Sequence, residues 1–125
     1  MFYKSYINWT ICFINRIDMK KYLGEFEELV LTMVCILGEG AYGNVIVQEF
    51  ENQLDRKVNL SSVHITLYRL EDKGLLTSHY GGATKTRGGR RKRYFSITNA
   101  GRNLLDKMKD DRMKLWHLMP TLKFS

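Results

Sequence analysis

The sequence predicts a mostly α-helical chain with one small β-hairpin, an α+β fold. Apolar residues recur at the spacing of a buried helix face in three segments before residue 74 and in one segment after residue 98. Between them, two short runs alternate apolar and polar residues, as the strands of a hairpin do. The stretch that joins these runs holds two glycine pairs and a cluster of arginine and lysine. These three observations together predict the fold class.

The first helix is expected from Glu25 to Leu37. Acidic residues in its first turn suit the positive end of the helix dipole, and Gly38 ends it. Cys35 falls within this apolar segment and is expected in the core. The residues expected on the buried face are Phe26, Leu29, Val30, Met33, Val34 and Leu37.

A second helix is expected from Tyr42 or Gly43 to about Gln53. It would bury Val45, Ile46 and Phe50, with Leu54 at its end. Residues 57–59 are a candidate for a short strand. Residues 38–45 match the glycine-rich phosphate loop of protein kinases letter by letter, but the preceding residues have helical periodicity and the other kinase motifs are missing. We therefore expect no nucleotide site.

The third helix is expected from about Ser61 to Lys73, with Asn59 or Ser61 as its cap. One stripe of this helix is apolar and should face the other helices. The stripe consists of Leu60, Val63, Leu67 and Leu70. The opposite face consists of Ser61, Ser62, Ile65, Arg69 and Lys73, with Tyr68 at its edge.

A hairpin and a final helix complete the fold. Residues 75–80 and 92–97 read as the two strands, with Phe95 and Ile97 facing the core by alternation. Thr98 caps a helix from Asn99 to about Met119, which Pro120 stops. Three helices, a basic hairpin and a last helix form a winged helix-turn-helix with a C-terminal dimerisation helix.

The chain is expected to divide into three parts. Residues 19–98 would form the winged helix-turn-helix, and residues 99–125 the dimerisation helix and tail. Residues 1–18 are an extension: either translation starts at Met19, or the segment is real and packs on the dimer. Its apolar run is well below the roughly 20 residues that cross a bilayer. Cys12 and Cys35 cannot complete a zinc site or a disulfide framework, so we expect no metal. We also expect no cofactor and no membrane contact. Because no secretory context is visible in the sequence, we expect a cytoplasmic location.

Positive charge is concentrated in one third of the chain. From Lys73 to Leu105 there are eight Lys or Arg residues and no Asp or Glu, whereas the rest has twelve basic and thirteen acidic residues. Clustered charge on a glycine-rich loop makes nucleic acid the leading partner. The alternative is a solvated loop that only aids solubility.

Several motifs resemble the PadR-like family of transcriptional regulators. They are residues 23–31, 41–43, 69–76, 88–95 and 97–102, in that order and spacing. The resemblance implies a dimeric DNA-binding regulator, a repressor, in a short form with one C-terminal helix. It also implies a dimer contact that can hold a flat aromatic effector. Where the family usually has Gly-Thr-Leu-Tyr, this chain has Ser61-Ser62-Val63-His64, so the operator sequence does not carry over.

The predicted partner is double-stranded DNA at a palindromic promoter site, bound through helix 61–73 and the wing, residues 81–93. Arg69 could contact guanine and Ile65 a thymine methyl, but an ion pair of Arg69 with Glu71, Asp72 or a neighbouring element is an equal alternative. His64 is expected to be packed or capping rather than to contact a base. The predicted DNA-binding residues are Tyr42, Ser61, Ser62, Ile65, Tyr68, Arg69, Lys73, Lys85, Arg87, Arg90, Arg91, Lys92 and Arg93.

The final helix has an apolar stripe longer than a small domain can cover, which predicts a homodimer. Trp116, or Trp9 if the extension is real, could stack on an effector, although burial of Trp116 in the interface is the favoured interpretation. No catalytic set of residues is present, so an enzyme is not expected. Two other classes stay open: a non-specific architectural or RNA-binding protein, and a winged helix that binds protein. The predicted interface residues are Leu105, Met108, Arg112, Leu115, Trp116 and Met119.

Overall fold

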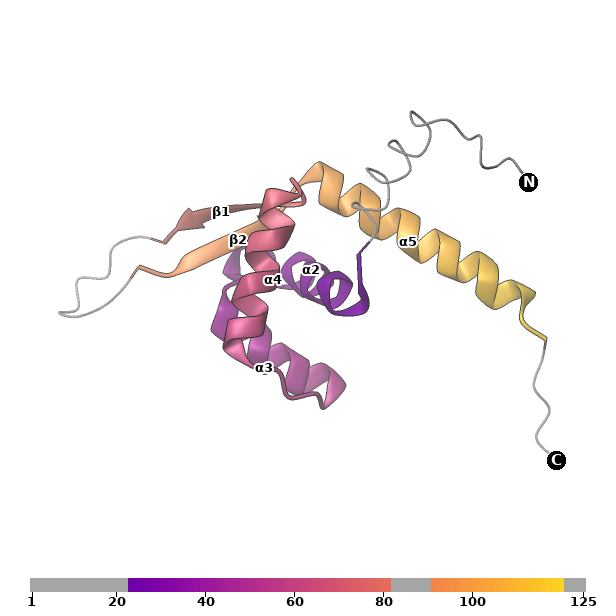
Figure 1. Ribbon diagram of the computed structural model, residues 1–125, viewed down its shortest axis with the longest axis horizontal. Helices are drawn as coiled ribbons and strands as arrows, with labels where there is room; N and C mark the ends of the chain where they lie inside the picture. Colours follow the sequence, from indigo (N-terminus) through magenta and orange to yellow (C-terminus); the bar gives the residue numbers. More distant parts are fainter. Residues whose placement is uncertain (1–22, 82–90, 121–125) are drawn as a thin grey trace, which may run out of the picture.

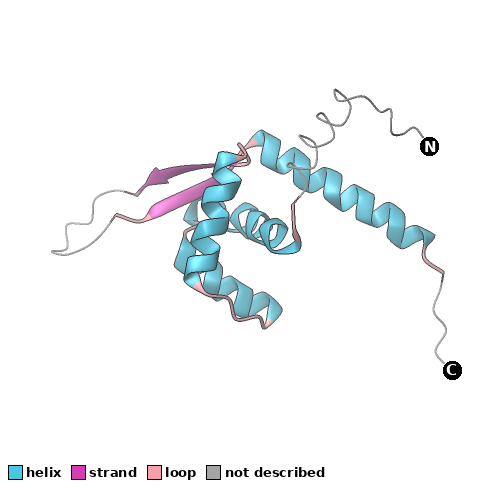
Figure 2. Ribbon diagram, viewed as in Figure 1, coloured by secondary structure: helices cyan, strands magenta, loops and turns pink. Residues whose placement is uncertain are grey.

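The computed structural model describes residues 23–81 and 91–120. A bundle of three helices lies at the centre, a two-stranded hairpin projects from one side, and a long helix leaves on the other (Figures 1 and 2). The expected extension, residues 1–18, and the tip of the wing lie outside the described residues. In chain order the elements are α2 (Glu25–Leu37), the 3-10 turn η1 (Gly38–Gly40), α3 (Gly43–Leu54), α4 (Leu60–Asp72), β1 (Leu76–Tyr80), β2 (Arg93–Ile97) and α5 (Asn99–Leu118).

The core forms around α2, which contacts α3, α4, α5 and β2. Because α2 is covered on more than one side, Leu31 is fully buried as well as the expected stripe residues Val30 and Val34. On α3, Ile46 and Phe50 are buried as expected, whereas Val45 is half-buried. The largest fully buried side chains are Phe50, Phe95, Leu31, Ile46, Leu67, Leu70 and Leu76.

The expected element ends agree closely with the structure. Gly38 ends α2 with a left-handed φ of 63°, and Gly74 follows α4 with a φ of 78°. Asn59, one of two candidate caps, accepts a hydrogen bond from the Ser62 N–H over 2.8 Å. Thr98 caps α5 by accepting from the Gly101 N–H at 3.0 Å. β1 and β2 pair antiparallel, with Ser78 opposite Phe95.

The short strand considered for residues 57–59 is wrong. This segment only links two helices, because Asn59 uses its backbone carbonyl and its side chain to begin α4. The hairpin instead meets the chain after α2, where the Phe95 N–H donates to the carbonyl of Ala41 at 2.9 Å. That hydrogen bond holds the hairpin against the start of α3.

Cys35 is half-buried rather than in the core, so that expectation is also wrong. It lies on the face of α2 that α5 only partly covers, and Arg102 approaches its sulfur at 3.6 Å. Arg112 of α5 still reaches Glu28 of α2, but the apolar residues of α5 beyond Met108, among them Leu115 and Trp116, are exposed.

Among the described residues, no single helix is long and apolar enough to cross a membrane. Taken as a pair across a 118° bend, residues 25–40 and 43–54 pass the same test of length and composition.

Candidate nucleic-acid interface

The outer face of α4 is exposed to solvent along most of its length. Ser61, Ser62, Ile65 and Arg69 are exposed, while Val63, Leu67 and Leu70 on the opposite side are completely buried. Within residues 23–81 and 91–120, no carboxylate lies within ion-pair distance of Arg69. The alternative of an ion pair for Arg69 is therefore not realised. The helix presents two hydroxyls at its N-terminal end, an apolar centre and an unpaired guanidinium.

Arg93 of β2 is held in a closed network by α4 and β1. Its Nη2 donates to Glu71 Oε1 at 2.8 Å and its Nε to Ser78 Oγ at 3.0 Å. The Ser78 hydroxyl in turn donates to Glu71 Oε2 at 2.6 Å. The guanidinium carbon lies 4.9 Å from the ring centroid of Tyr68. We call Arg93, Glu71, Ser78 and Tyr68 the Arg93 network.

Lys92 and Tyr42 form a second pairing, which joins the hairpin to the residue before α3. The Lys92 ammonium donates to the Tyr42 hydroxyl at 3.2 Å and lies 4.5 Å from the centroid of its ring. This hydrogen bond raises the pKa of Lys92 above its ordinary value of 10.5, so the side chain is charged at neutral pH. Tyr42 also packs edge-to-face on Tyr94 at 5.4 Å. Tyr42 therefore holds the Lys92 ammonium in place while the ammonium keeps its positive charge.

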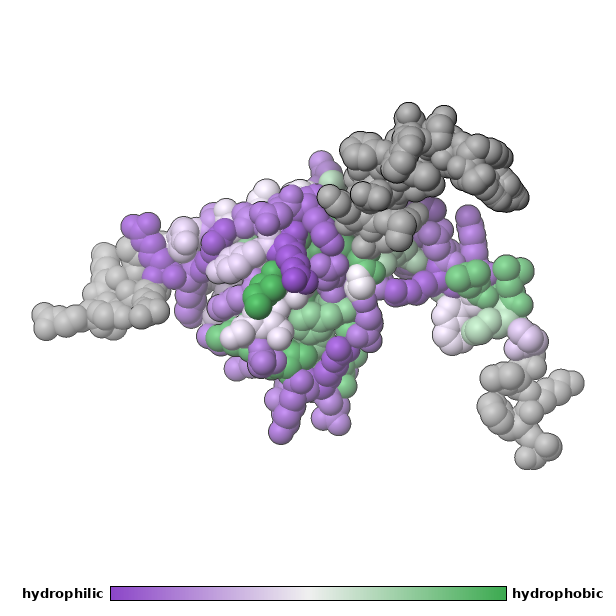
Figure 3. Space-filling model, in the orientation of Figure 1, coloured by the Kyte–Doolittle hydropathy of each residue, from purple (hydrophilic) through white to green (hydrophobic). Residues whose placement is uncertain are grey.

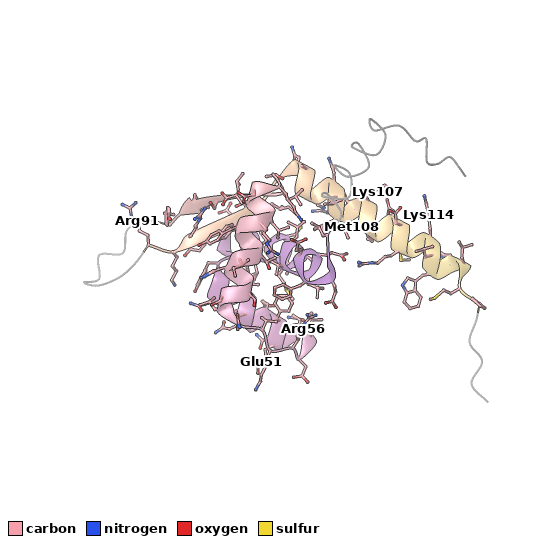
Figure 4. The ribbon with its side chains drawn as sticks, viewed as in Figure 1. Glu51, Arg56, Arg91, Lys107, Met108 and Lys114 are labelled. Carbon is pink, nitrogen blue, oxygen red and sulfur yellow. The ribbon has the colours of Figure 1, made fainter. Side chains whose placement is uncertain are left out.

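The start of α3, α4 and the hairpin together line a cleft of about 460 Å³. Arg91, Lys92 and Arg93 line it together with Tyr42, Tyr68 and Tyr80, and none of its lining residues is acidic. Arg91 lies at the outer end of the described hairpin, where its side chain points away from the body of the protein (Figure 4). The cleft is thus a cationic, hydroxyl-bearing recess beside the outer face of α4.

His64 is packed inside this region. Its ring stacks on that of Tyr68 at 6.2 Å, and a Cβ added to Gly43 would overlap its imidazole. Because Gly43 has no side chain, the imidazole of His64 can lie against its backbone and the starts of α3 and α4 can approach closely. The expectation of a packed rather than a base-contacting histidine agrees with this placement.

The remaining predicted residues are more scattered. Lys73 pairs with Glu27 of α2 at 3.1 Å, which ties it to the scaffold. Lys85, Arg87 and Arg90 lie outside the described residues. The structure therefore brings together Tyr42, Tyr68, Arg91, Lys92 and Arg93 around the cleft and places Ser61, Ser62, Ile65 and Arg69 on the adjoining helix face.

The second predicted site lies between α2 and α5. Arg112 makes a bidentate ion pair with Glu28, whose side chain is only 11% exposed. The pair is part of the wall of a groove of about 570 Å³ that Leu105 and Trp116 also line. Met108 is half-buried on α5, whereas Leu115, Trp116 and Met119 are exposed. No group of metal-ligating side chains occurs in the described part of the chain.

Sequence reasoning missed Glu71, Ser78 and Glu28 as contributors to these sites. Strand alternation could have indicated the first two, because it places Arg93 on the same face of β2 as Phe95 and Ile97, toward the rest of the protein. For Glu28 the pattern was its position among apolar neighbours on α2, but nothing in the sequence identified Arg112, 84 residues away, as its partner.

The model of the PadR-like family of transcriptional regulators matches residues 33–107. The chain belongs to the PadR-like family of transcriptional regulators. The matched residues run from α2 through α4 and the hairpin into α5, and so contain both the outer face of α4 and the cationic cleft. The resemblance seen in the sequence motifs is confirmed. A comparison with curated proteins gave no match.

Solved PadR structures share the fold. A PadR-like transcription factor from Bacteroides fragilis has a TM-score of 0.65 at 18% identity, over 87% of this chain and 94% of that one. A PadR family regulator from Clostridium difficile has a TM-score of 0.61 at 23% identity, over 77% and 95%. Bacillus subtilis PadR, in complex with operator DNA, has a TM-score of 0.58 at 17% identity, over 81% of this chain and 50% of that one. These matches confirm the winged helix-turn-helix.

Proposed function

We propose that this PadR-like protein is a dimeric, sequence-specific DNA-binding repressor that occupies a palindromic promoter site. The observation that carries the proposal is the outer face of α4, exposed beside a cleft lined by cations and no acids. A face of this kind fits the major groove, with the hairpin over the adjacent backbone. The operator complex of Bacillus subtilis PadR, which has the same fold, supports the choice of DNA as partner.

The α4 residues would divide the work of recognition along the helix. Ser61 and Ser62, at the N-terminal end, suit phosphate or base edges, since free N–H groups there favour anions. Ile65 suits a thymine methyl. Arg69 suits guanine, because its guanidinium can donate to two acceptors at once and has no carboxylate partner in the described structure. Base contacts of this kind carry sequence specificity, whereas phosphate contacts do not.

The wing would supply most of the affinity. Arg91 and Lys92 lie at the mouth of the cleft, and Lys85, Arg87 and Arg90 belong to the same stretch of sequence. If about five phosphates are neutralised, the logarithm of affinity should fall with the logarithm of salt concentration at a slope of about −4 to −5.

A second copy of the chain is the proposed partner of α5. Leu115 and Trp116 are 63% and 66% exposed, and Leu118 and Met119 extend the same apolar end of the helix. Figure 3 shows this apolar surface at the end of α5, apart from the bundle. Isologous pairing through α5 would give the two-fold symmetry that a palindromic site requires. Sedimentation equilibrium should give twice the monomer mass, and Leu115→Asp should shift the protein toward monomer.

An aromatic effector is a second candidate occupant of the α2–α5 groove. Its indole wall and apolar lining suit a planar molecule, but the same surface suits the partner's α5. A Trp9→Phe variant leaves Trp116 as the sole indole emitter. Saturable quenching by planar hydrophobic compounds would support an effector, and its absence would support interface packing alone. We infer no cofactor and no catalytic role, and a cytoplasmic location.

Selection of bound duplexes from a random pool tests the function directly. The selected duplex and a scrambled duplex of equal length are then titrated against the protein by fluorescence anisotropy. We expect a palindromic consensus and tighter binding of the selected duplex by about 10³-fold or more. A steep salt dependence with no preference would indicate an architectural or RNA-binding protein, and no salt-dependent binding would indicate a protein-binding winged helix.

A further inference from the structure

We propose that Arg93 is a positioning residue that fixes the hairpin against the C-terminal end of α4, and that it does not contact phosphate. The proposal rests on the proposed DNA-binding function. It replaces the sequence-based prediction that Arg93 contacts DNA as the other cations of the wing do. The reason is that the guanidinium of Arg93 already bonds Glu71 and Ser78.

The hydrogen bonds of the Arg93 network join three elements. Glu71 belongs to α4, Ser78 to β1 and Arg93 to β2, and each side chain bonds the other two, at 2.6 to 3.0 Å. The loop is closed, so both carboxylate oxygens of Glu71 are used. A closed set of this kind has one geometry and fixes the angle between helix and hairpin.

Aromatic rings occupy the faces of the same guanidinium. Its carbon lies 4.9 Å from the Tyr68 centroid, 5.5 Å from that of Phe95 and 5.8 Å from that of Tyr80. The side chain of Arg93 is 34% exposed, and that of Glu71 is 29% exposed. Nε and Nη2 of Arg93 are used within the network, and a phosphate would have to compete with the Glu71 carboxylate for the charge of the same guanidinium.

The network lies next to the residue proposed to contact bases. Arg69 is adjacent to Tyr68 and two residues before Glu71, in the last turns of α4. Fixing the hairpin to these turns would set where the wing meets the backbone when Arg69 enters the groove. A small change in that angle would prevent both contacts from forming together.

The carboxylate of Glu71 makes the positioning role of Arg93 testable, because it is a negative charge beside the surface proposed to bind DNA. If Glu71 has no positioning role, its removal takes away a repulsive charge and frees Arg93 for phosphate, so DNA binding should tighten. If it positions the hairpin, its removal should weaken binding. The two accounts predict opposite signs.

The experiment compares Glu71→Ala with Asp72→Ala, a matched loss of one acidic charge. Asp72 is exposed at the end of α4 and has no ion-pair or hydrogen-bond partner within the described residues. Arg93→Gln and the double variant Glu71→Ala/Arg93→Gln complete a cycle. Affinities for the selected duplex are measured by anisotropy over a series of salt concentrations. The temperature is kept well below the melting temperature of every variant, so that unfolding does not enter.

We expect Glu71→Ala to weaken binding by about five-fold or more, with Arg93→Gln similar and the double variant no worse than either. Asp72→Ala should leave binding unchanged or slightly tighter. The salt slopes of Glu71→Ala and Arg93→Gln should equal each other, because both variants release the hairpin from α4, whereas a phosphate contact made by Arg93 itself would be lost only in Arg93→Gln.

Tighter binding by Glu71→Ala would overturn the proposal, as would a slope for Arg93→Gln that is less steep than that of Glu71→Ala by about 0.9, the change for one phosphate contact. In both cases the proposed function would stand. If the wild type bound no duplex in a salt-dependent manner, the proposed function would fail, and the role of Arg93 with it.

Discussion

Replacing both Arg91 and Lys92 by alanine should flatten the salt dependence of DNA binding while leaving the fold intact. The structure describes five of the eight basic residues between 73 and 105, and three of the five pair with carboxylates that lie outside that stretch. The pairs are Lys73–Glu27, Arg93–Glu71 and Arg102–Asp106. Arg91 and Lys92 have no carboxylate partner within the described residues, so they are the described cations most available to phosphate.

The magnitude follows from counterion release. Each phosphate neutralised contributes about 0.9 to the salt slope, so losing two contacts should make the slope less steep by about 1.8. From an initial value of about −4 to −5, the double variant should reach about −2 to −3. The loss of affinity should be similar for selected and scrambled duplexes, because phosphates are common to both.

Anisotropy titrations at several salt concentrations measure the slope directly, and two controls make the result specific. Lys114→Ala removes one positive charge from α5, on the side of the molecule opposite the hairpin, and should leave the slope unchanged (Figure 4). Tyr42→Phe removes a neutral hydroxyl and leaves Lys92 protonated at neutral pH, so the affinity can fall but the salt slope should also be unchanged. A double variant with the wild-type slope would refute the placement of Arg91 and Lys92 at the interface.

Three further substitutions test other parts of the structure. Arg112→Ala should destabilise the protein by about 1–2 kcal/mol in denaturant titration, because it leaves the carboxylate of Glu28 without its partner. The cost is less than for a fully buried pair, since Arg112 is 56% exposed and water can reach the carboxylate in its place. An unchanged midpoint would contradict this. Gly43→Ala should cost about 1–2 kcal/mol through overlap with His64 and Leu60, and the added change His64→Ala should restore the part that is due to the imidazole. Arg69→Ala should cost about 1–3 kcal/mol of affinity for the selected duplex and much less for a scrambled one; equal losses would remove Arg69 from sequence recognition.

Local features of the sequence predicted most of the fold. The limits of α2, the cap of α5 and the hairpin follow from helical spacing, glycine, threonine and proline, all of which act over a few residues. The failures concern contacts between distant segments. Residues 57–59 are a candidate strand from the sequence, but the hairpin bonds Ala41 instead. Cys35 lies in an apolar helix, but on the side that α5 leaves partly open.

The same division applies to the candidate site. That Ser61, Ser62, Ile65 and Arg69 share an exposed face follows from the helical period, since the apolar stripe must face the bundle. The pairing of Lys92 with Tyr42 joins residues 50 apart and has no local pattern that predicts it. Periodicity can therefore assign a residue to a face, whereas its partner depends on how the elements pack.

The basic stretch shows why charge along the sequence is not charge on the surface. It contains no acidic residue, yet Glu27, Glu71 and Asp106 reach its cations from just outside or from another helix. Arg93 and Lys92 differ in their position in the hairpin. Arg93 belongs to β2 and, by strand alternation, shares a face with Phe95, whereas Lys92 precedes the first residue pair of the strands. Arginine suits the inward position, because a planar guanidinium can bond Glu71 and Ser78 while it stacks on Tyr68, and a lysine ammonium cannot do both. In a wing of this composition, the face that each residue takes decides whether its charge is available to DNA.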